Sequence, residues 1–264
     1  MNMYWVYNLP NWLFELLVVT LFIAFGLAGL FPTRAWMRRV HIKSSHNDIV
    51  GYYLEGITVL YGVSLGLLAI AAWQTFNDTQ AKVAQEAAAL YSLYRGVGSL
   101  PEPARTSLQE DLRQYARQVI DPGWAEQRRG IIPTANNLTL SKFQKDLASF
   151  TPTTEEQRIL MADISRRFDT LDESRSIRLD SVEDELPPPL WALILVGALI
   201  CVVVTWFFLM DSLSMHIWMT VFIAFLLGLM VFMVAALDNP YRGEVSVSPA
   251  PFERVYNEMI NPPR

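Results

Sequence analysis

The sequence predicts an all-α integral membrane protein, with four transmembrane helices in a 2+2 arrangement around a small helical extramembrane domain. Two observations predict this class: four long apolar runs, and a polar middle that separates them into pairs. A membrane-spanning helix needs roughly 20 predominantly apolar residues, and each run reaches that length. The runs cover residues 11–31, 51–76, 190–210 and 217–237. The last two contain no charged side chain.

The composition agrees with this class and excludes others. Hydrophobic residues make up 52% of the 264 residues, which exceeds the share in an ordinary soluble domain. The formal net charge of -5 includes no long block of either sign, so nucleic acid is not an expected partner. The only cysteine, Cys201, lies inside the third run, which excludes a disulfide framework and a cysteine metal site.

The first run is predicted to be a membrane anchor and not a cleaved signal peptide. Residues 1–10 carry no positive side chain, whereas basic residues follow the run, at Arg34, Arg38, Arg39 and Lys43. By the positive-inside rule, the short basic loop at 32–50 would lie in the cytoplasm and the middle domain outside. Basic residues beside the middle domain and in the tail support the opposite orientation, so both remain open.

The chain divides into four predicted segments. Residues 1–76 hold transmembrane helices 1 and 2, residues 77–189 form a helical extramembrane domain, residues 190–237 form a transmembrane hairpin, and residues 238–264 form a C-terminal tail. The prolines at 187–189 mark a sharp boundary before the third span, because proline cannot continue a preceding helix. Residues 211–216 are too few for anything but a tight turn between antiparallel helices.

The second transmembrane helix is predicted to continue out of the bilayer. Apolar side chains recur there at steps of three and four, the spacing of an amphipathic helix, at Val83, Ala87, Leu90, Tyr94 and Val97. A second polar-domain helix follows over Leu108 to Val119, and then a loop that contains Asn136 and Asn137. A capping-box pattern at Thr153 and Glu156 begins a last helix that reaches almost to Leu186.

Two arginines lie on the apolar stripe of that last helix, which suggests that they face the interior of the bundle. Arg175 and Arg178 would then need an acidic partner, and Glu86 on the extension of the second helix is the candidate. Solvated charges at the rim are an equal alternative. An anion site made by the paired arginines is a third.

One face of the second span carries small and partly polar side chains, at Glu55, Thr58, Gly62, Gly66 and Ala69. Gly62 and Gly66 could form a GxxxG contact that lets another helix approach closely, or the face could line a pore around a symmetry axis. The larger side chains Tyr61, Leu65 and Leu68 on the adjoining face are candidates for a hydrophobic constriction. Glu15 and Glu55 are the only charged residues inside the four runs, and a carboxylate near the headgroups is the simpler interpretation of both.

Nothing in the sequence indicates catalysis, a cofactor or a metal site. His41, His46 and His216 lie in or beside short predicted loops, without ligand spacing and without a partnered nucleophile. We therefore expect a protein that is not an enzyme.

The end of the fourth span carries a more specific pattern. Asp238, Pro240 and Gly243 are spaced as Asp-x-Pro-x-x-Gly, followed by Ser248-Pro249 and Phe252. With the order of two spans, a helical domain and two spans, this pattern resembles the bacterial bestrophin-like family of unknown function. The residues that also fit that family are Glu86-Ala87, Tyr115, Arg175, Arg178, Leu186-Pro187 and Trp191. The resemblance covers nearly the whole chain.

The resemblance implies a multi-pass protein of the bacterial inner membrane and a homo-oligomeric ion channel in which the second helix surrounds a central pore. Its expected partners are the lipid bilayer, other copies of the chain and inorganic ions. The candidate pore-lining residues are Glu55, Thr58, Tyr61, Gly62, Leu65 and Gly66. Bestrophins keep their helical domain in the cytosol, and the second span here lacks their ladder of phenylalanines. The alternative is a non-conducting scaffold or signal-responsive module that acts through its helical domain.

Overall fold

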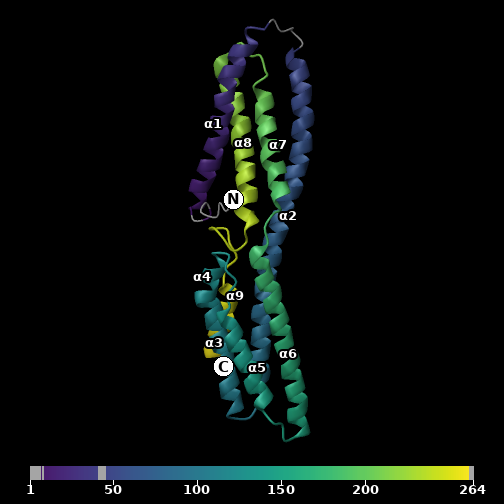
Figure 1. The fold of residues 1–264 in the computed structure, drawn as a ribbon, viewed down its shortest axis with the longest axis vertical. Coiled ribbons are helices and arrows are strands. Elements are labelled where there is room, and N and C mark those ends of the chain that lie inside the picture. Colours follow the sequence, from purple (N-terminus) through teal and green to yellow (C-terminus); the bar gives the residue numbers. More distant parts are fainter. Residues whose placement is uncertain (1–6, 8, 41–45, 262–264) are drawn as a thin grey trace. The chain divides into compact units, whose positions relative to one another are not determined.

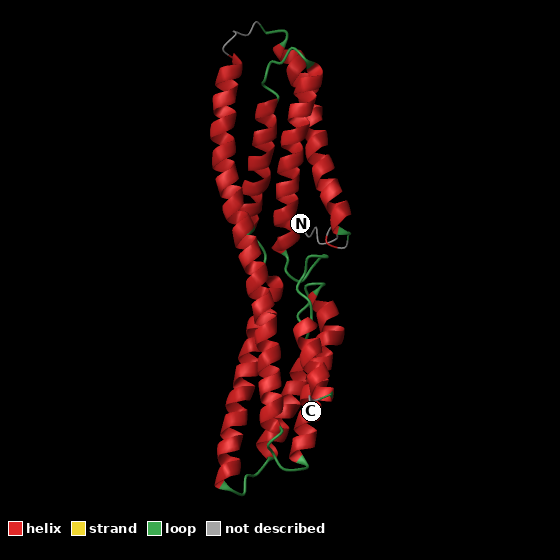
Figure 2. Cartoon of the chain, turned by 180° about the vertical axis from the view of Figure 1, so that it is seen from behind, coloured by secondary structure: helices red, strands yellow, loops and turns green. Residues whose placement is uncertain are grey.

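A computed structural model describes residues 7, 9–40 and 46–261, and these residues form helices and no strands. Figure 1 shows the helices: α1 (Asn11–Met37), α2 (His46–Val97), α3 (Ala104–Gln118), α4 (Trp124–Gln127), α5 (Ala135–Ser149), α6 (Glu155–Asp180), α7 (Pro188–Thr205), α8 (Leu213–Asp238) and α9 (Ala250–Ile260). The chain divides into two compact units. The membrane unit holds residues 1–75, 185–239 and 243–245, and the polar unit holds 76–184, 240–242 and 246–264. The all-α class is confirmed (Figure 2).

The membrane unit consists of α1, the first half of α2, α7 and α8. Each belongs to a helix long and apolar enough to cross a bilayer, so the chain is a multi-pass membrane protein. α1 and α8 lie against each other, and small residues permit this: a Cβ at Gly228 would lie 3.0 Å from the Val19 Cα. Tyr61 and Leu65 from α2 are buried in the same core as Ala198 and Val202 of α7.

The polar unit is a helical bundle built on the second half of α2. Its core gathers side chains from α2, α3, α5, α6 and α9, including Leu90, Leu112, Phe143, Phe168 and Phe252. The predicted continuation of the second span is confirmed, because α2 is one unbroken helix of 52 residues.

α1 and α2 are both longer at their loop ends than the sequence predicted. α1 continues past Phe31 to Met37, and α2 begins at His46. The extension of α1 buries Arg34, which contacts His216 Nδ1 at 3.3 Å and donates to the Asp211 carbonyl at 3.1 Å. The prediction of a loop from residue 32 was therefore wrong at its start. Lys43 of that loop lies outside the described residues.

The polar unit departs from the predictions at two places. Asn136 and Asn137 lie in α5 and not in a loop, because this helix buries Leu140, Phe143 and Leu147 in the core. The N-cap of α6 is Thr154 and not Thr153. Thr154 Oγ1 accepts from the Gln157 amide at 3.2 Å, and Gln157 Oε1 accepts from the Thr153 amide at 2.7 Å.

The helices α6 and α7 both end earlier than predicted. α6 ends at Asp180 and passes into a short 3₁₀ turn over Ser181–Glu183. α7 ends at Thr205, five residues before the end of the apolar run. The backbone beyond it bonds to side chains of α2: Asn47 donates to the Leu209 carbonyl at 2.7 Å, and His46 Nε2 lies 2.9 Å from the Phe207 carbonyl.

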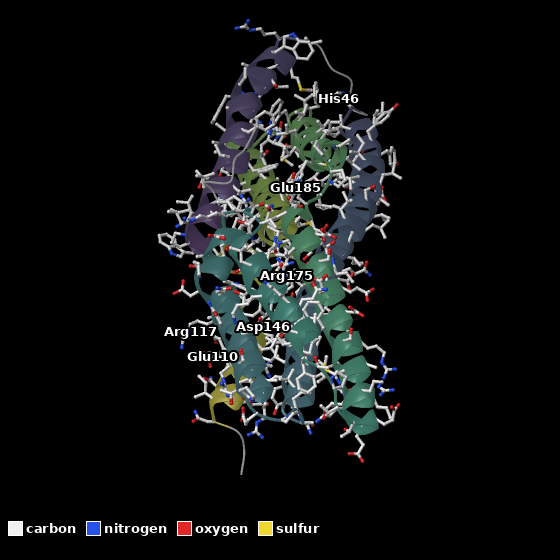
Figure 3. All side chains as sticks on the ribbon, turned by 60° about the horizontal axis from the view of Figure 1, so that its bottom comes forward. His46, Glu110, Arg117, Asp146, Arg175 and Glu185 are labelled. Atoms are coloured by element: carbon white, nitrogen blue, oxygen red, sulfur yellow. The ribbon has the colours of Figure 1, made fainter. Side chains whose placement is uncertain are left out.

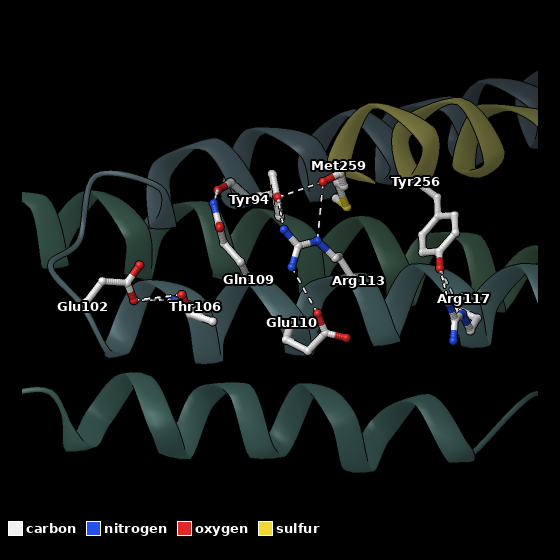
Figure 4. A network of polar contacts seen from close by, with 9 residues as sticks. All are labelled: Tyr94, Glu102, Thr106, Gln109, Glu110, Arg113, Arg117, Tyr256 and Met259. Atoms are coloured by element: carbon white, nitrogen blue, oxygen red, sulfur yellow. Dashed lines mark hydrogen bonds and ion pairs between the residues drawn. The ribbon is translucent and has the colours of Figure 1, made fainter. Parts of the chain in front are cut away.

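The C-terminal tail forms the amphipathic helix α9, which the sequence analysis missed. Figure 4 shows how polar side chains of α2 and α3 hold it. Tyr94 donates to the Met259 carbonyl at 3.0 Å, and Arg117 Nε donates to the Tyr256 hydroxyl at 3.0 Å. Arg113 Nη2 donates to Tyr94 at 2.7 Å. The apolar face of α9 buries Phe252 and Met259 in the bundle.

This packing predicts that α9 contributes to the stability of the polar unit. The Phe252→Ala variant removes a fully buried ring and should lower the free energy of unfolding by about 3–5 kcal/mol. Chemical denaturation of the detergent-solubilised protein measures this change. Ile260→Ala is the control on the same helix, because its side chain is 48% exposed. Equal stabilities of the two variants would contradict the observed packing of α9.

Candidate functional site

One face of α2 is buried against the rest of the membrane unit. The Tyr61 hydroxyl donates to the Ile194 carbonyl of α7 at 2.9 Å. The ring fits there because residue 197 is glycine: a Cβ at Gly197 would lie 2.4 Å from the Tyr61 ring. Leu65, four residues on, is also buried. These contacts fix the rotation of α2 about its own axis within the unit.

The other candidate pore-lining residues lie beside this face and are less buried. Glu55 and Gly62 are exposed, and Thr58 and Gly66 are partly exposed. A Cβ added at Gly62 or Gly66 would meet nothing within 4 Å. The structure thus separates the six candidates by burial: Tyr61 and Leu65 lie in the core that α2 shares with α7, and the other four lie on the adjoining, more exposed flank of α2. We call Glu55, Thr58, Gly62 and Gly66 the open side of α2.

The hydroxyl of Thr58 is occupied within its own helix. It donates to the Leu54 carbonyl at 2.7 Å and lies 3.1 Å from the Glu55 carbonyl. Ser64 likewise donates to the Leu60 carbonyl at 2.9 Å. Hydroxyls bonded in this way still offer oxygen lone pairs to an ion or a water molecule.

The buried face of α2 continues along the whole helix. Buried side chains recur at steps of three, four and seven residues, at Tyr61, Leu65, Ala72, Thr79, Val83, Glu86, Leu90, Leu93 and Val97. Such steps keep side chains on one face of a helix. Thr79 and Glu86 are the buried polar residues of this series.

Glu86 lies at the centre of a buried polar network in the polar unit. Its carboxylate pairs with Arg178 of α6, and its Oε1 accepts from the Tyr115 hydroxyl of α3 at 2.5 Å. Arg178 Nη1 donates to Gln127 Oε1 of α4 at 2.7 Å. Glu86, Arg178, Tyr115 and Gln127 are all fully buried. The network therefore joins four helices at one point.

The C-terminal segment completes this network. The Arg178 guanidinium lies 5.6 Å from the ring centroid of Phe252, a cation–π distance. The Tyr241 hydroxyl lies 3.2 Å from Ser181 Oγ, and Ser181 donates to the Arg178 carbonyl at 2.6 Å. Tyr241 and Phe252 belong to the stretch that carries the Asp-x-Pro-x-x-Gly, Ser-Pro and Phe pattern.

Charge and burial fix the protonation states in the network. Burial, followed by the negative charge of Glu86, raises the pKa of the Tyr115 phenol well above its usual value. Burial opposes the charge of Arg178, but attraction to Glu86 outweighs it and raises the pKa of the guanidinium. Tyr115 therefore remains a donor and Arg178 remains a cation throughout the physiological range of pH.

The structure brings Glu86 together with Arg178 and not with Arg175. Arg175, labelled in Figure 3, is only half-buried. Its guanidinium contacts Asn137 Oδ1 of α5. Gln127 was not singled out in the sequence, because a single glutamine in a short helix gives no periodic signal.

Two further polar clusters lie in the membrane unit. Asp238, the last residue of α8, accepts from the Leu186 amide at 2.6 Å and from Trp191 Nε1 at 3.0 Å. These two hydrogen bonds connect the end of α8 to the start of α7. They give one structural explanation for three residues of the family pattern, Asp238, Leu186 and Trp191. His216 Nε2 lies 2.9 Å from the Thr205 carbonyl, on the opposite side of the ring from Arg34. Within the described ranges, no three His, Cys, Asp or Glu side chains form a group that could hold a metal ion.

The buried ion pair predicts a large loss of stability when one partner is removed. Arg178→Met leaves Glu86 buried without its cation and should cost about 3–5 kcal/mol of unfolding free energy. Adding Glu86→Leu to that variant should recover much of the loss, since the unpaired charge is gone. Denaturant titrations of both single variants and the double variant measure the coupling.

Arg158→Met is the control for this cycle. Arg158 forms an exposed pair with Glu155 at 2.9 Å on the same helix, and such pairs contribute about 0–1 kcal/mol. If Arg178→Met cost no more than Arg158→Met, the network would not hold the bundle together.

The comparisons with known proteins give a match to one family model and a likeness in fold to solved structures. A family model described as a bestrophin-like domain matches residues 20–252. A point variant of a bacterial bestrophin homologue from Klebsiella pneumoniae is similar in structure, with a TM-score of 0.68 at 13% identity, over 94% of this chain and 99% of that chain. Another structure of a Klebsiella pneumoniae bestrophin homologue has a TM-score of 0.65 at 11% identity, over 93% of this chain and 97% of that chain. No curated protein matches the chain.

Proposed function

Because this chain belongs to the bestrophin-like family, we propose that it is one subunit of a homo-oligomeric ion channel in the bacterial inner membrane, with α2 lining the pore. The likeness in fold to bacterial bestrophin homologues supports this proposal. The pore would lie on the symmetry axis of the oligomer.

The open side of α2 is the observation that carries the proposal. In a single span facing only lipid, two glycines one turn apart on an exposed side add neither packing nor apolar surface. Small residues do permit the close approach of another helix or a narrow passage around an axis. A Cβ added at Gly62 or Gly66 would meet nothing within 4 Å inside the protomer, so this surface of α2 has room for either arrangement between protomers.

Glu55 gives the open side an electrostatic role. A charged side chain within a span is costly in lipid, and such residues often mark the path of an ion. Repeated around an axis, the Glu55 carboxylates would form a ring of negative charge that favours cations. Thr58, one turn further on, would offer its hydroxyl oxygen to the same path.

In this proposal Tyr61 and Leu65 do not line the pore but anchor α2 in the core of the protomer. Their contacts with α7 hold the open side of α2 away from the core of the protomer. The bond of Tyr61 to the Ile194 carbonyl is specific in direction, so it also resists rotation of α2. In this proposal the helix continues into the polar unit, whose bundle forms the vestibule.

The proposal predicts a current whose ion preference depends on Glu55. Purified protein in a planar bilayer under a salt gradient should show discrete openings. Glu55→Gln should lower the selectivity for cations, because the ring of negative charge is lost. The reversal potential should then move toward the equilibrium potential of the anion. Measuring single-channel current and reversal potential for the wild type and the variant tests this.

Glu15→Gln is the matched control, because it makes the same chemical change in α1, outside the proposed pore. It should leave the reversal potential unchanged. Silence of the folded wild-type protein in both orientations and several salts would instead favour a non-conducting scaffold that acts through the polar unit.

A further inference from the structure

A groove in the polar unit lies between α2 and α6 and takes no part in the proposed pore. Its volume is about 430 Å³, within the range of small-molecule sites. The α2 side supplies Tyr91, Ser92, Arg95 and Ser99, and the α6 side supplies Leu160, Asp163 and Arg167. Two arginines against one aspartate give the groove a net positive charge.

Arg167 lines the groove and is held in a fixed position by hydrogen bonds. Its Nε donates to Asp163 Oδ2 at 2.6 Å, and its Nη1 donates to the Ser92 carbonyl at 3.2 Å. Residue 96 is glycine at this crossing, where a Cβ would lie only 3.2 Å from the Arg167 Cδ. These contacts use Nε and Nη1, so Nη2 still has N–H groups to offer a ligand.

Arg95 supplies a second, uncommitted cation. It is exposed on α2 and forms no ion pair among the residues that the structure describes. Arg95 lines the same groove as Arg167, whose guanidinium is already oriented by its hydrogen bonds. Two guanidinium groups around one cavity are well suited to a carboxylate or phosphate group, which accepts paired hydrogen bonds from them.

The remaining lining residues indicate that the ligand is larger than a simple ion. Tyr91 and Leu160 provide an aromatic and an aliphatic wall, and the Ser99 hydroxyl is exposed. The geometry points to a binding site for a small organic anion, whose carboxylate or phosphate group contacts Arg95 and Arg167 and whose apolar body lies along Tyr91 and Leu160. This site is independent of whether the protein conducts ions.

Isothermal titration calorimetry on the full-length protein in detergent tests the site. The probes are AMP as an organic phosphate, benzoate as an organic carboxylate, and inorganic phosphate as a simple ion. The wild type should bind AMP or benzoate saturably. Arg95→Gln should raise the Kd about tenfold, the equivalent of one charge-assisted contact. Ala88→Trp, which fills the groove from an exposed position, should abolish binding.

The control is Arg158→Gln, which removes an exposed arginine of α6 outside the groove and should leave the Kd unchanged. Circular dichroism and gel filtration establish that each variant is folded. The proposal is overturned if neither organic probe binds saturably, if inorganic phosphate alone binds, or if Arg95→Gln binds as the wild type does. AMP and benzoate separate a phosphate ligand from a carboxylate ligand.

Discussion

The ion pair between Glu86 and Arg178 is the constraint on which the polar unit depends. Both side chains are fully buried, where an unpaired charge would cost several kcal/mol, so the bundle can close only when α2 and α6 bring them together. Tyr115 and Gln127 use the remaining hydrogen-bonding capacity of the pair, which adds α3 and α4. Phe252 covers the guanidinium and brings in the C-terminal segment. One pair thus specifies the register of five segments that are far apart in sequence.

α2 is the helix that contributes residues to both units. It is one helix of 52 residues, and its core side chains keep to one face from Tyr61 to Val97. A helix with such a continuous buried face also has a continuous outer face. In the apolar half, that outer surface includes Gly62 and Gly66, where an added Cβ would meet nothing within 4 Å in the protomer. The proposed pore uses this outer surface of the apolar half.

The four spans and the continuation of α2 could be predicted, because bilayer thickness sets a length that apolar runs either reach or do not. The polar helices α5 and α9 could not, since short amphipathic helices are stabilised by tertiary packing more than by their own sequence. The rotation of α2 could not be predicted either, because the sequence of residues 51–76 does not show which side of the helix faces the core. Tyr61 and Leu65 were therefore as suitable for a pore as Thr58. Arg178 and Glu86 were identified as candidate partners because each lies on or beside an apolar stripe, but only packing could choose between Arg175 and Arg178.

The most direct test of the account is the rate at which a charged, membrane-impermeant thiol reagent modifies a cysteine on the open side of α2 during current recording. The native Cys201 is fully buried and does not interfere. The account predicts that the Gly62→Cys variant reacts and loses its current, whereas Val196→Cys does not react, because Val196 is exposed on α7, outside the proposed pore. Equal reactivity of the two variants, or modification of Val196→Cys alone, would contradict a water-filled pore along α2.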